Sequence, residues 1–222
     1  MGAPHQALLM GGGDSHVFVN FTQALNPSGT VLSSTSAAMN VTTGHHLFVF
    51  VGYTFTATTA TVTDTAGNTY TALTQRVTAN GFAIGQWFYS LNVTGNAANV
   101  VTVTLAVAKG QFSIAVFDFS RATLPVLDVE AYGVVDSGTS VSSAAFSTTA
   151  PGLVLVGTNV LITNQSGVTI DGGVTHMTSP AITGNALQMG YLLTSSTLSS
   201  QVITASSTPT DSGRVICIAA FK

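Results

Sequence analysis

The sequence predicts an all-β protein, an antiparallel two-sheet sandwich built from a degenerate internal duplication. Three observations lead to this fold class. Short β-branched and aromatic runs, separated by Gly, Asn, Asp and Ser, recur along all 222 residues. No window carries apolar residues at helical spacing, and Leu, Glu, Lys and Arg are sparse. Several segments of the first half recur, in the same order, in the second half.

The duplication is visible in three pairs of segments: 29–53 with 138–159, FAIGQWFYSL (82–91) with ALQMGYLLTS (186–195), and FSIAVFDF (112–119) with RVICIAAF (214–221). This alignment pairs Gly29 with Gly138, Leu47 with Leu153, Ala83 with Ala186 and Phe112 with Arg214. The copies then span about 29–121 and 138–222. We expect one sandwich over 15–222, because the connection 121–137 carries a strand pattern instead of a polar linker composition. Two tandem small sandwiches are the alternative.

The expected strands follow from alternation and turn residues. In the first part they lie near 15–22, 30–41, 46–55, 59–64, 69–77, 82–91, 99–107 and 112–119. The second part adds 127–134, 140–148, 152–161, 167–177, 185–194, 200–206 and 213–221. In VTVTLAV (101–107), Val101, Val103, Leu105 and Val107 are expected on one face. FSIAVFDF is apolar on both faces, which predicts a central strand.

The segment Asp64-Thr-Ala-Gly67-Asn68 is typical of a hairpin turn, since Gly and Asn tolerate a left-handed backbone. The alternative, a calcium loop, needs six or more oxygen ligands, and Asp64 is the one carboxylate there.

Composition excludes several function classes. Charged residues make up 6% of the chain and the net charge is −3, with scattered cations, so nothing indicates nucleic-acid binding. Apolar runs such as LFVFV (47–51) are too short to span a membrane as a helix. Low charge removes the repulsion that keeps proteins monomeric, which favours dense self-assembly.

No coherent active site emerges, and we expect neither an enzyme nor a cofactor. The acids form no paired motif, and no G-x-S-x-G elbow or phosphate loop occurs. Asp118, in an apolar strand, is either a structural carboxylate or a general base with a raised pKa. The single cysteine, Cys217, is expected to be buried and inert. Adjacent His45 and His46 point to opposite faces of an extended chain, so no metal site is expected.

Aromatic and asparagine residues offer two further candidates. Trp87 and Tyr89 share one face of their strand, where they either line a sugar-binding platform or pack in a core or interface. Four N-x-[ST] sequons, at Asn20, Asn40, Asn92 and Asn164, are candidate glycan acceptors if the protein is exposed at a surface.

The first residues, 1–14, are interpreted as an assembly arm. Leu8, Leu9 and Met10 form a small apolar cluster beside the hinge Gly11, Gly12 and Gly13. We expect the arm to dock on an adjacent subunit and to cap an exposed edge strand there. The segment lacks a basic n-region and a long apolar h-region, so we expect synthesis without a Sec signal peptide.

The segments 44–53, VTDTAGNTYTAL (62–73), 99–107, 112–120 and VICIAAFK (215–222) resemble jelly-roll-like β-sandwich domains of bacteriophage decoration and tail proteins and of bacterial surface proteins. The resemblance spans most of 29–222 and implies a display, adhesion or decoration role without catalytic residues. The strand-only architecture, the duplication, the low charge and the lack of a coherent active site together predict a non-enzymatic protein that self-assembles into, or decorates, a virion or extracellular filament. Its partners would be itself and a capsid or tail protein. The alternative is a carbohydrate-binding or adhesive surface module.

Overall fold

The structure, a computed structural model, describes residues 15–26, 29–162, 166–177 and 184–222. The predicted arm, with Leu8, Leu9, Met10 and the Gly11–Gly13 hinge, lies outside the described residues. The described residues form nineteen β-strands and no helix, and neighbouring strands pair antiparallel. The predicted fold class, an all-β antiparallel sandwich, is confirmed.

The strands of the first half are β1 (Val17–Ala24), β2 (Thr30–Thr35), β3 (Met39–Val41), β4 (His46–Tyr53), β5 (Ala60–Asp64), β6 (Thr71–Ala72), β7 (Arg76–Val77), β8 (Ile84–Ser90), β9 (Asn96–Asn99), β10 (Val101–Gly110) and β11 (Ser113–Ser120). Those of the second half are β12 (Leu127–Val135), β13 (Gly138–Ser142), β14 (Leu153–Ile162), β15 (Ser166–Ile170), β16 (Thr175–Met177), β17 (Gly184–Leu193), β18 (Thr204–Asp211) and β19 (Arg214–Phe221).

Both halves repeat one strand order. The first large sheet runs β1-β11-β4-β8-β6, with β7 also on β8, and the second large sheet runs β12-β19-β14-β17-β16. The small sheets, β2-β10-β5 and β13-β18-β15, correspond in the same way. Even the short pair β3-β9 has a counterpart, the isolated bridge between Phe146 and Gln201. The duplication therefore extends from sequence to topology.

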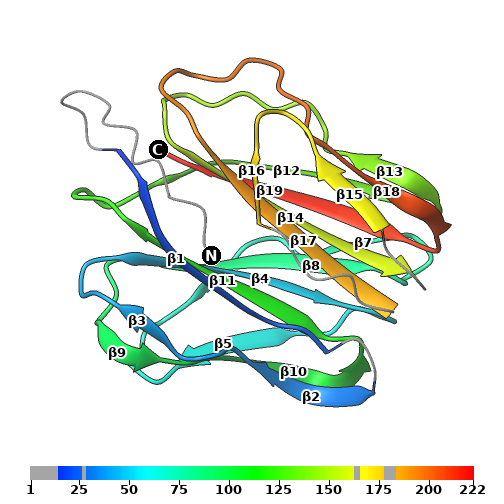
Figure 1. Cartoon of the computed structure of the whole chain (residues 1–222), viewed down its shortest axis with the longest axis horizontal. Helices are drawn as coiled ribbons and strands as arrows, with labels where there is room; N and C mark the ends of the chain where they lie inside the picture. Colours follow the sequence, from blue (N-terminus) through cyan, green and yellow to red (C-terminus); the bar gives the residue numbers. More distant parts are fainter. Residues whose placement is uncertain (1–14, 27–28, 163–165, 178–183) are drawn as a thin grey trace.

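The sheets stack in layers, with the two large sheets facing each other and a small sheet on the outer side of each (Figure 1). Three hydrophobic clusters fill the spaces between the layers. The central cluster combines both large sheets, and one further cluster lies inside each half. The expected pair of sheets thus occurs once in each half. How the chain divides into domains stays a prediction, because the central cluster belongs to both halves.

Stacking explains why several strands are apolar on both faces. Every residue of β4 is buried, with Phe48 and Phe50 in the central cluster and Leu47, Val49 and Val51 in the first-half cluster. A strand covered on both sides needs a continuous apolar run. Burying each such side chain contributes about 1.5–3 kcal/mol, so these strands supply most of the core stabilisation.

The structure moves the alignment of the two copies by one residue in two segments. Leu47 faces the first-half cluster whereas Leu153 faces the central cluster, so the equivalent of Leu47 is Val154. In β8 and β17 the same argument pairs Trp87 with Met189, both in the central cluster. A shift of one residue in a strand exchanges its two faces, which sequence similarity alone does not detect.

Two expected strands differ because the chain changes sheet inside them. The expected strand 30–41 divides at Ser36, whose N–H donates to Val101 O (2.9 Å) and whose Oγ accepts from Val101 N (3.0 Å). Ser143 makes the same two bonds with Ile203 (2.9 and 3.2 Å).

In β10, Val107 was expected on the same buried face as Val101, Val103 and Leu105. It is instead 56% exposed, because the pairing of β10 with β2 shifts register after Thr104.

Candidate functional site

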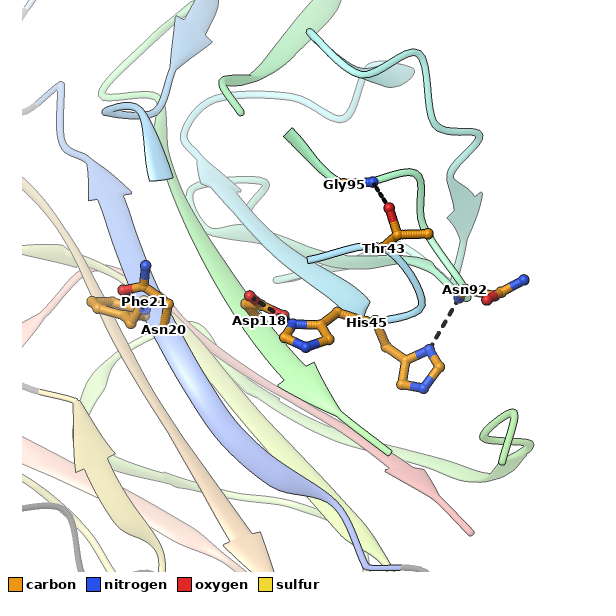
Figure 2. Close-up of polar contacts among 8 residues, drawn as sticks. Asn20, Phe21, Thr43, His45, Asn92, Gly95 and Asp118 are labelled. Atoms are coloured by element: carbon orange, nitrogen blue, oxygen red, sulfur yellow. Dashed lines mark hydrogen bonds and ion pairs between the residues drawn. The ribbon is translucent and has the colours of Figure 1, made fainter. Parts of the chain in front are cut away.

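A histidine–aspartate pair lies at one end of the first large sheet. Asp118 of β11 has no exposed surface, and His45, directly before β4, keeps 17% of its side chain exposed. His45 Nδ1 lies 2.9 Å from Asp118 Oδ1 and 3.2 Å from Oδ2, so an N–H there donates to the carboxylate (Figure 2). A bulge in β1 between Phe18 and Asn20 brings Asn20 opposite Asp118.

The turn that carries His45 is held by the loop before β9. Gly44, with φ +91°, donates to Val93 O (2.9 Å), and Val93 N donates back to His45 O (3.0 Å). Gly95 N donates to Thr43 Oγ1 (3.0 Å). These bonds fix the backbone on both sides of His45, so the turn holds the imidazole next to Asp118 independently of the His45–Asp118 bond.

Burial raises the pKa of Asp118, and the His45 charge and hydrogen bond oppose this shift only in part. A carboxylate without exposed surface loses its hydration, and one partner replaces only some of the water it had. The Asp118 carboxyl therefore holds a proton more readily than an exposed carboxyl does.

The second half forms the same strands without this carboxylate. Asp118 pairs with Leu47 in the first large sheet. In the second large sheet Ala220 pairs with Val154, the equivalent of Leu47. An alanine therefore occupies the position of the aspartate, and the fold does not require the charge there.

A glycine occupies the position of the histidine. Val93 N donates to His45 O (3.0 Å) in the first half, and Thr194 N donates to Gly152 O (2.8 Å) in the second. Each acceptor lies directly before the corresponding strand, β4 or β14. The His45–Asp118 pair thus occurs in the first half only, and the second half forms the equivalent strands without it.

The polar groups next to the pair already have partners of their own. Thr43, the hydroxyl drawn beside it, already accepts from Gly95 N (Figure 2). His46 Nδ1 accepts from Asn92 N (3.1 Å), whereas His45 Nδ1 bonds to Asp118, so the two imidazoles have different partners. Within the described ranges no group of three or more His, Cys, Asp or Glu residues is arranged to hold a metal ion.

The turn at Asp64 is built around its carboxylate. Oδ1 accepts from Asn68 N (2.9 Å), and Oδ2 accepts from Asn68 Nδ2 (2.8 Å), Tyr70 OH (2.9 Å) and Asn99 Nδ2 (3.2 Å). Gly67 has φ +76°, as the turn requires. The expected hairpin is wrong, because β5 pairs with β10 and β6 with β8, so this turn carries the chain from a small sheet to a large one.

The aromatic pair does not form an open platform. Trp87 is 2% exposed, lies in the central cluster, and donates from Nε1 to Cys217 O (3.1 Å) in the second half. Its ring is therefore closed to a sugar. Tyr89 is half-buried and packs edge-on against Phe221 at 5.3 Å. Both rings contact residues of the second half. Their positions along β8 showed that they share one face, but not that the second half covers this face.

The sequons differ in accessibility. Asn40 and Asn92 are exposed, and Asn92 has φ +53°. Asn20 is half-buried, and its Oδ1 accepts from Phe21 N (2.8 Å), which ties the side chain to the β1 bulge (Figure 2). Asn164 lies outside the described residues. Glycan attachment at the exposed pair stays a prediction.

The thiol of Cys217 is buried in the central cluster, and burial raises its pKa to about 12. A thiol with so high a pKa is almost fully protonated at neutral pH and is a poor nucleophile.

A shallow depression of about 450 Å³ lies beside the loop after β4 and is lined by Ala57, Thr58, Thr59, Ala60, Ala72, Gln75 and Gln86. Gln75 Nε2 donates to Tyr53 OH and to Thr58 O, both at 2.9 Å. The polar groups at this depression thus bond to one another.

One surface feature was not expected from the sequence. Phe55 and Phe82 meet edge to face at 5.5 Å between centroids and are 48% and 36% exposed. Phe55 and Thr56 both have a left-handed backbone, with φ of 62° and 71°. For an aromatic and a β-branched residue this costs about 1–3 kcal/mol each. No turn residue marks the position, so no sequence signal indicated it.

No protein-family model and no curated protein matches this sequence. Among solved structures, the X-ray structure of melon necrotic spot virus is similar at 11% identity and TM-score 0.23, over 99% of this chain and 93% of the other. A structure of oxalate decarboxylase from Bacillus subtilis has 10% identity and TM-score 0.23, over 93% of this chain and 77% of the other. Likenesses at this TM-score do not establish a shared fold or function. In the described part of the chain, no helix is long and apolar enough to cross a membrane.

Proposed function

We propose that this chain is a non-enzymatic structural protein that assembles with copies of itself into, or onto, a virion or extracellular filament. The proposal rests on one observation: the surface has few charged residues and exposes several large apolar side chains. Only 6% of the residues are charged. Large apolar side chains such as Val17, Val107, Leu124 and Val126 are half or more exposed. Weak repulsion together with such side chains favours association.

The interior supports a scaffold role. The apolar faces of the large sheets fill the central cluster, and Trp87 and Cys217 lie within it. The candidate aromatic and thiol groups therefore contribute to packing. A capsid or tail protein is the expected further partner, and the arm, residues 1–14, is proposed to dock on an adjacent subunit.

Sedimentation velocity over a wide range of protein concentration, followed by negative-stain microscopy, tests this function. We expect species larger than the monomer that grow with concentration and show a repeating contact in images. The matched control is the same chain with charged residues introduced at the exposed positions Leu124 and Val126. A strictly monomeric wild-type protein at high concentration would overturn the proposal.

The alternative carbohydrate-binding role loses its main candidate because Trp87 is buried. A glycan array still decides the matter. Saturable binding by a folded protein that assembles poorly would favour that role over a structural one.

A further inference from the structure

The exposed rings of Phe55 and Phe82 form a small apolar surface, here called the ring pair, at one end of the first half. In β4 and β8 the ladder ends at Tyr53 and Ile84. The ring pair follows directly beyond this last pair, where the chain leaves the sheet. Two exposed aromatic rings in mutual contact present more apolar area than any single side chain nearby.

Hydrogen bonds hold the ring pair in place. Thr56 N donates to Gly81 O (3.1 Å), which fixes the left-handed segment beside Phe55. Phe82 N donates to Asn80 Oδ1 (3.0 Å). Asn80 Nδ2 in turn donates to Asp136 O (3.0 Å) and Ser212 O (2.6 Å) of the second half. The rings are therefore preorganised, and little conformational freedom remains to be lost on binding.

The second half shows that the fold does not require this arrangement. The ladder between β14 and β17 continues to Ile162 and Gly184. By register these two residues are equivalent to Phe55 and Phe82. One copy thus extends its strands here, while the other adopts a strained backbone and exposes two rings. Strain that the fold could avoid is a reason to look for a function.

The arm provides a segment of matching chemistry, and its root lies at the opposite end of the strands. Ser15 precedes Val17, which pairs with Ser120, whereas Ser113 at the other end of β11 pairs with Gly52. Leucine and methionine side chains pack well on aromatic rings, and a thioether adds a favourable sulfur–aromatic contact. The arm's Leu8, Leu9 and Met10 are such side chains.

The length of the arm bears on which copy it contacts. Nine residues separate Leu8 from Val17, so Leu8 extends at most about 30–32 Å from that point. The start of β1 is level with His45. The ring pair lies just beyond Tyr53, where β4 ends about 26 Å farther along the sheet, and it is offset by two strand spacings of about 4.8 Å. A contact within one molecule would therefore need the arm almost fully extended along the whole sheet, whereas the arm of a neighbouring molecule can meet the ring pair without that loss of conformational freedom.

We propose that the Leu8–Met10 segment of one molecule packs on the Phe55–Phe82 ring pair of the next. This inference rests on the proposed self-assembly and names its contact. Because the arm and its receiving surface lie at opposite ends, the contact is head-to-tail. A head-to-tail contact repeats from molecule to molecule and generates a ring or a filament.

Complementary variants test the contact by sedimentation velocity. One variant lacks residues 1–14, and the other carries Phe55→Ser with Phe82→Ser. We expect each alone to remain monomeric where the wild type assembles, and an equimolar mixture to stop at one-to-one dimers. Val202→Ser, at an exposed apolar position outside the ring pair, is the matched control and should assemble like the wild type. Wild-type assembly by the ring variant, or no dimer in the mixture, would overturn the proposal.

A synthetic peptide of residues 1–14 provides a second measurement that does not depend on the ring variant folding. Added to the arm-deleted chain, it should bind and slow amide exchange in 54–58 and 80–83, and Phe82→Ser alone should weaken this binding at least tenfold. Protection elsewhere, or none, contradicts the inference. If the wild type stays monomeric while the peptide binds as expected, the arm binds the ring pair of its own molecule, and both the proposed function and the contact between molecules fail. If the wild type assembles and the peptide binds elsewhere, only the contact fails.

Discussion

At the scale of single residues, two aspartates of the first half show how environment decides the behaviour of one chemical group. Asp64 receives hydrogen bonds from Asn68, Tyr70 and Asn99, and although burial alone would raise its pKa, these bonds lower it. Asp118 is fully buried with His45 as its partner, and burial raises its pKa. One carboxyl stabilises the fold when ionised, and the other is costly in that form.

Replacing Asp118 should therefore change the pH dependence of stability. Its folded-state pKa is raised, so its favourable contribution is complete below the unfolded value of about 4 and is lost as pH rises through the folded pKa. In Asp118→Asn this loss disappears. We expect the variant to gain unfolding free energy relative to the wild type as pH rises from 4 to 7, measured by urea denaturation.

The second half suggests the control for this prediction. The double variant His45→Gly with Asp118→Ala introduces the residues found at Gly152 and Ala220, and it should fold and show the same altered pH dependence. If Asp118→Asn instead destabilised the protein equally at every pH, the pair would be a structural element and not a proton-binding addition.

At the scale of elements, the turn from Asp64 to Asn68 shows that a turn signal does not say which strands it joins. Asp64, Gly67 and Asn68 predicted a turn correctly, yet the chain passes from the first small sheet to the first large sheet. The carboxylate also bonds to Asn99 of β9, far along the sequence. Long-range hydrogen bonds of this kind help to determine which strands the turn connects. The spacing of residues within the turn does not predict them.

Asp64→Ala should be strongly destabilising, by about 2–3 kcal/mol, because it leaves several half-buried donors without their acceptor. The pKa of Asp64 is lowered, so its contribution is complete above the unfolded value of about 4 and is lost as pH falls through the folded pKa. The difference between wild type and variant should therefore shrink in acid, opposite to the behaviour at Asp118. Thermal unfolding between pH 2 and pH 7 measures this.

Asp64→Asn separates charge from geometry at this turn. The amide oxygen can still accept from Asn68 N, but the amide NH₂ would face the donors that Oδ2 now accepts from. The Asp64→Asn variant should therefore lose at least half as much stability as Asp64→Ala. An alanine variant as stable as the wild type at pH 7 would show that the turn is held by other contacts.

How far the sequence predicts each element depends on the range of the forces that place it. Alternation in β10 correctly assigned Val101, Val103 and Leu105 to a buried face, because a strand's period is local. The apolar faces of β11 correctly indicated a covered strand. The prediction failed for Val107 because the register shift there depends on the partner strand β2, which the local sequence does not specify.

The site features lie further outside the reach of sequence patterns. His45 and Asp118 are separated by 73 residues and meet only because β4 pairs with β11. Phe55 and Phe82 meet because two strands end together, and the left-handed backbone at Phe55 has no marker residue. Their pairing is a property of the assembled sheet, whereas apolar periodicity is a property of the local chain.

At the scale of the whole molecule, the two halves are joined by close packing and a few cross-bonds. Asn159 of the second half donates from Nδ2 to Tyr53 O (2.9 Å) and Ile84 O (2.7 Å) of the first. Phe50 packs over Gly157, where a side chain would meet the ring. Glycine here is required by the close approach of the large sheets, since its backbone lies directly under an aromatic ring.

Gly157→Ala tests whether the halves are held in this register. A Cβ at Gly157 would lie 2.5–2.7 Å from three Phe50 ring carbons, so either the ring or the sheets must move. Overpacking of this kind costs about 1–3 kcal/mol, and we expect the variant to lose that much unfolding free energy in urea denaturation. The matched control is Gly110→Ala, where a Cβ would meet no atom closer than 3.8 Å.

A double-mutant cycle then assigns the cost to the contact between halves. Phe50→Leu removes the ring that the new methyl group meets, so Gly157→Ala should cost less in the Phe50→Leu background, with a coupling of about 0.5–3 kcal/mol. The coupling arises because one residue belongs to β4 and the other to β14, and their contact exists only when the large sheets face each other. Additive effects of the two substitutions would mean that the halves do not pack through Phe50 and Gly157, and the layered arrangement would be wrong at its centre.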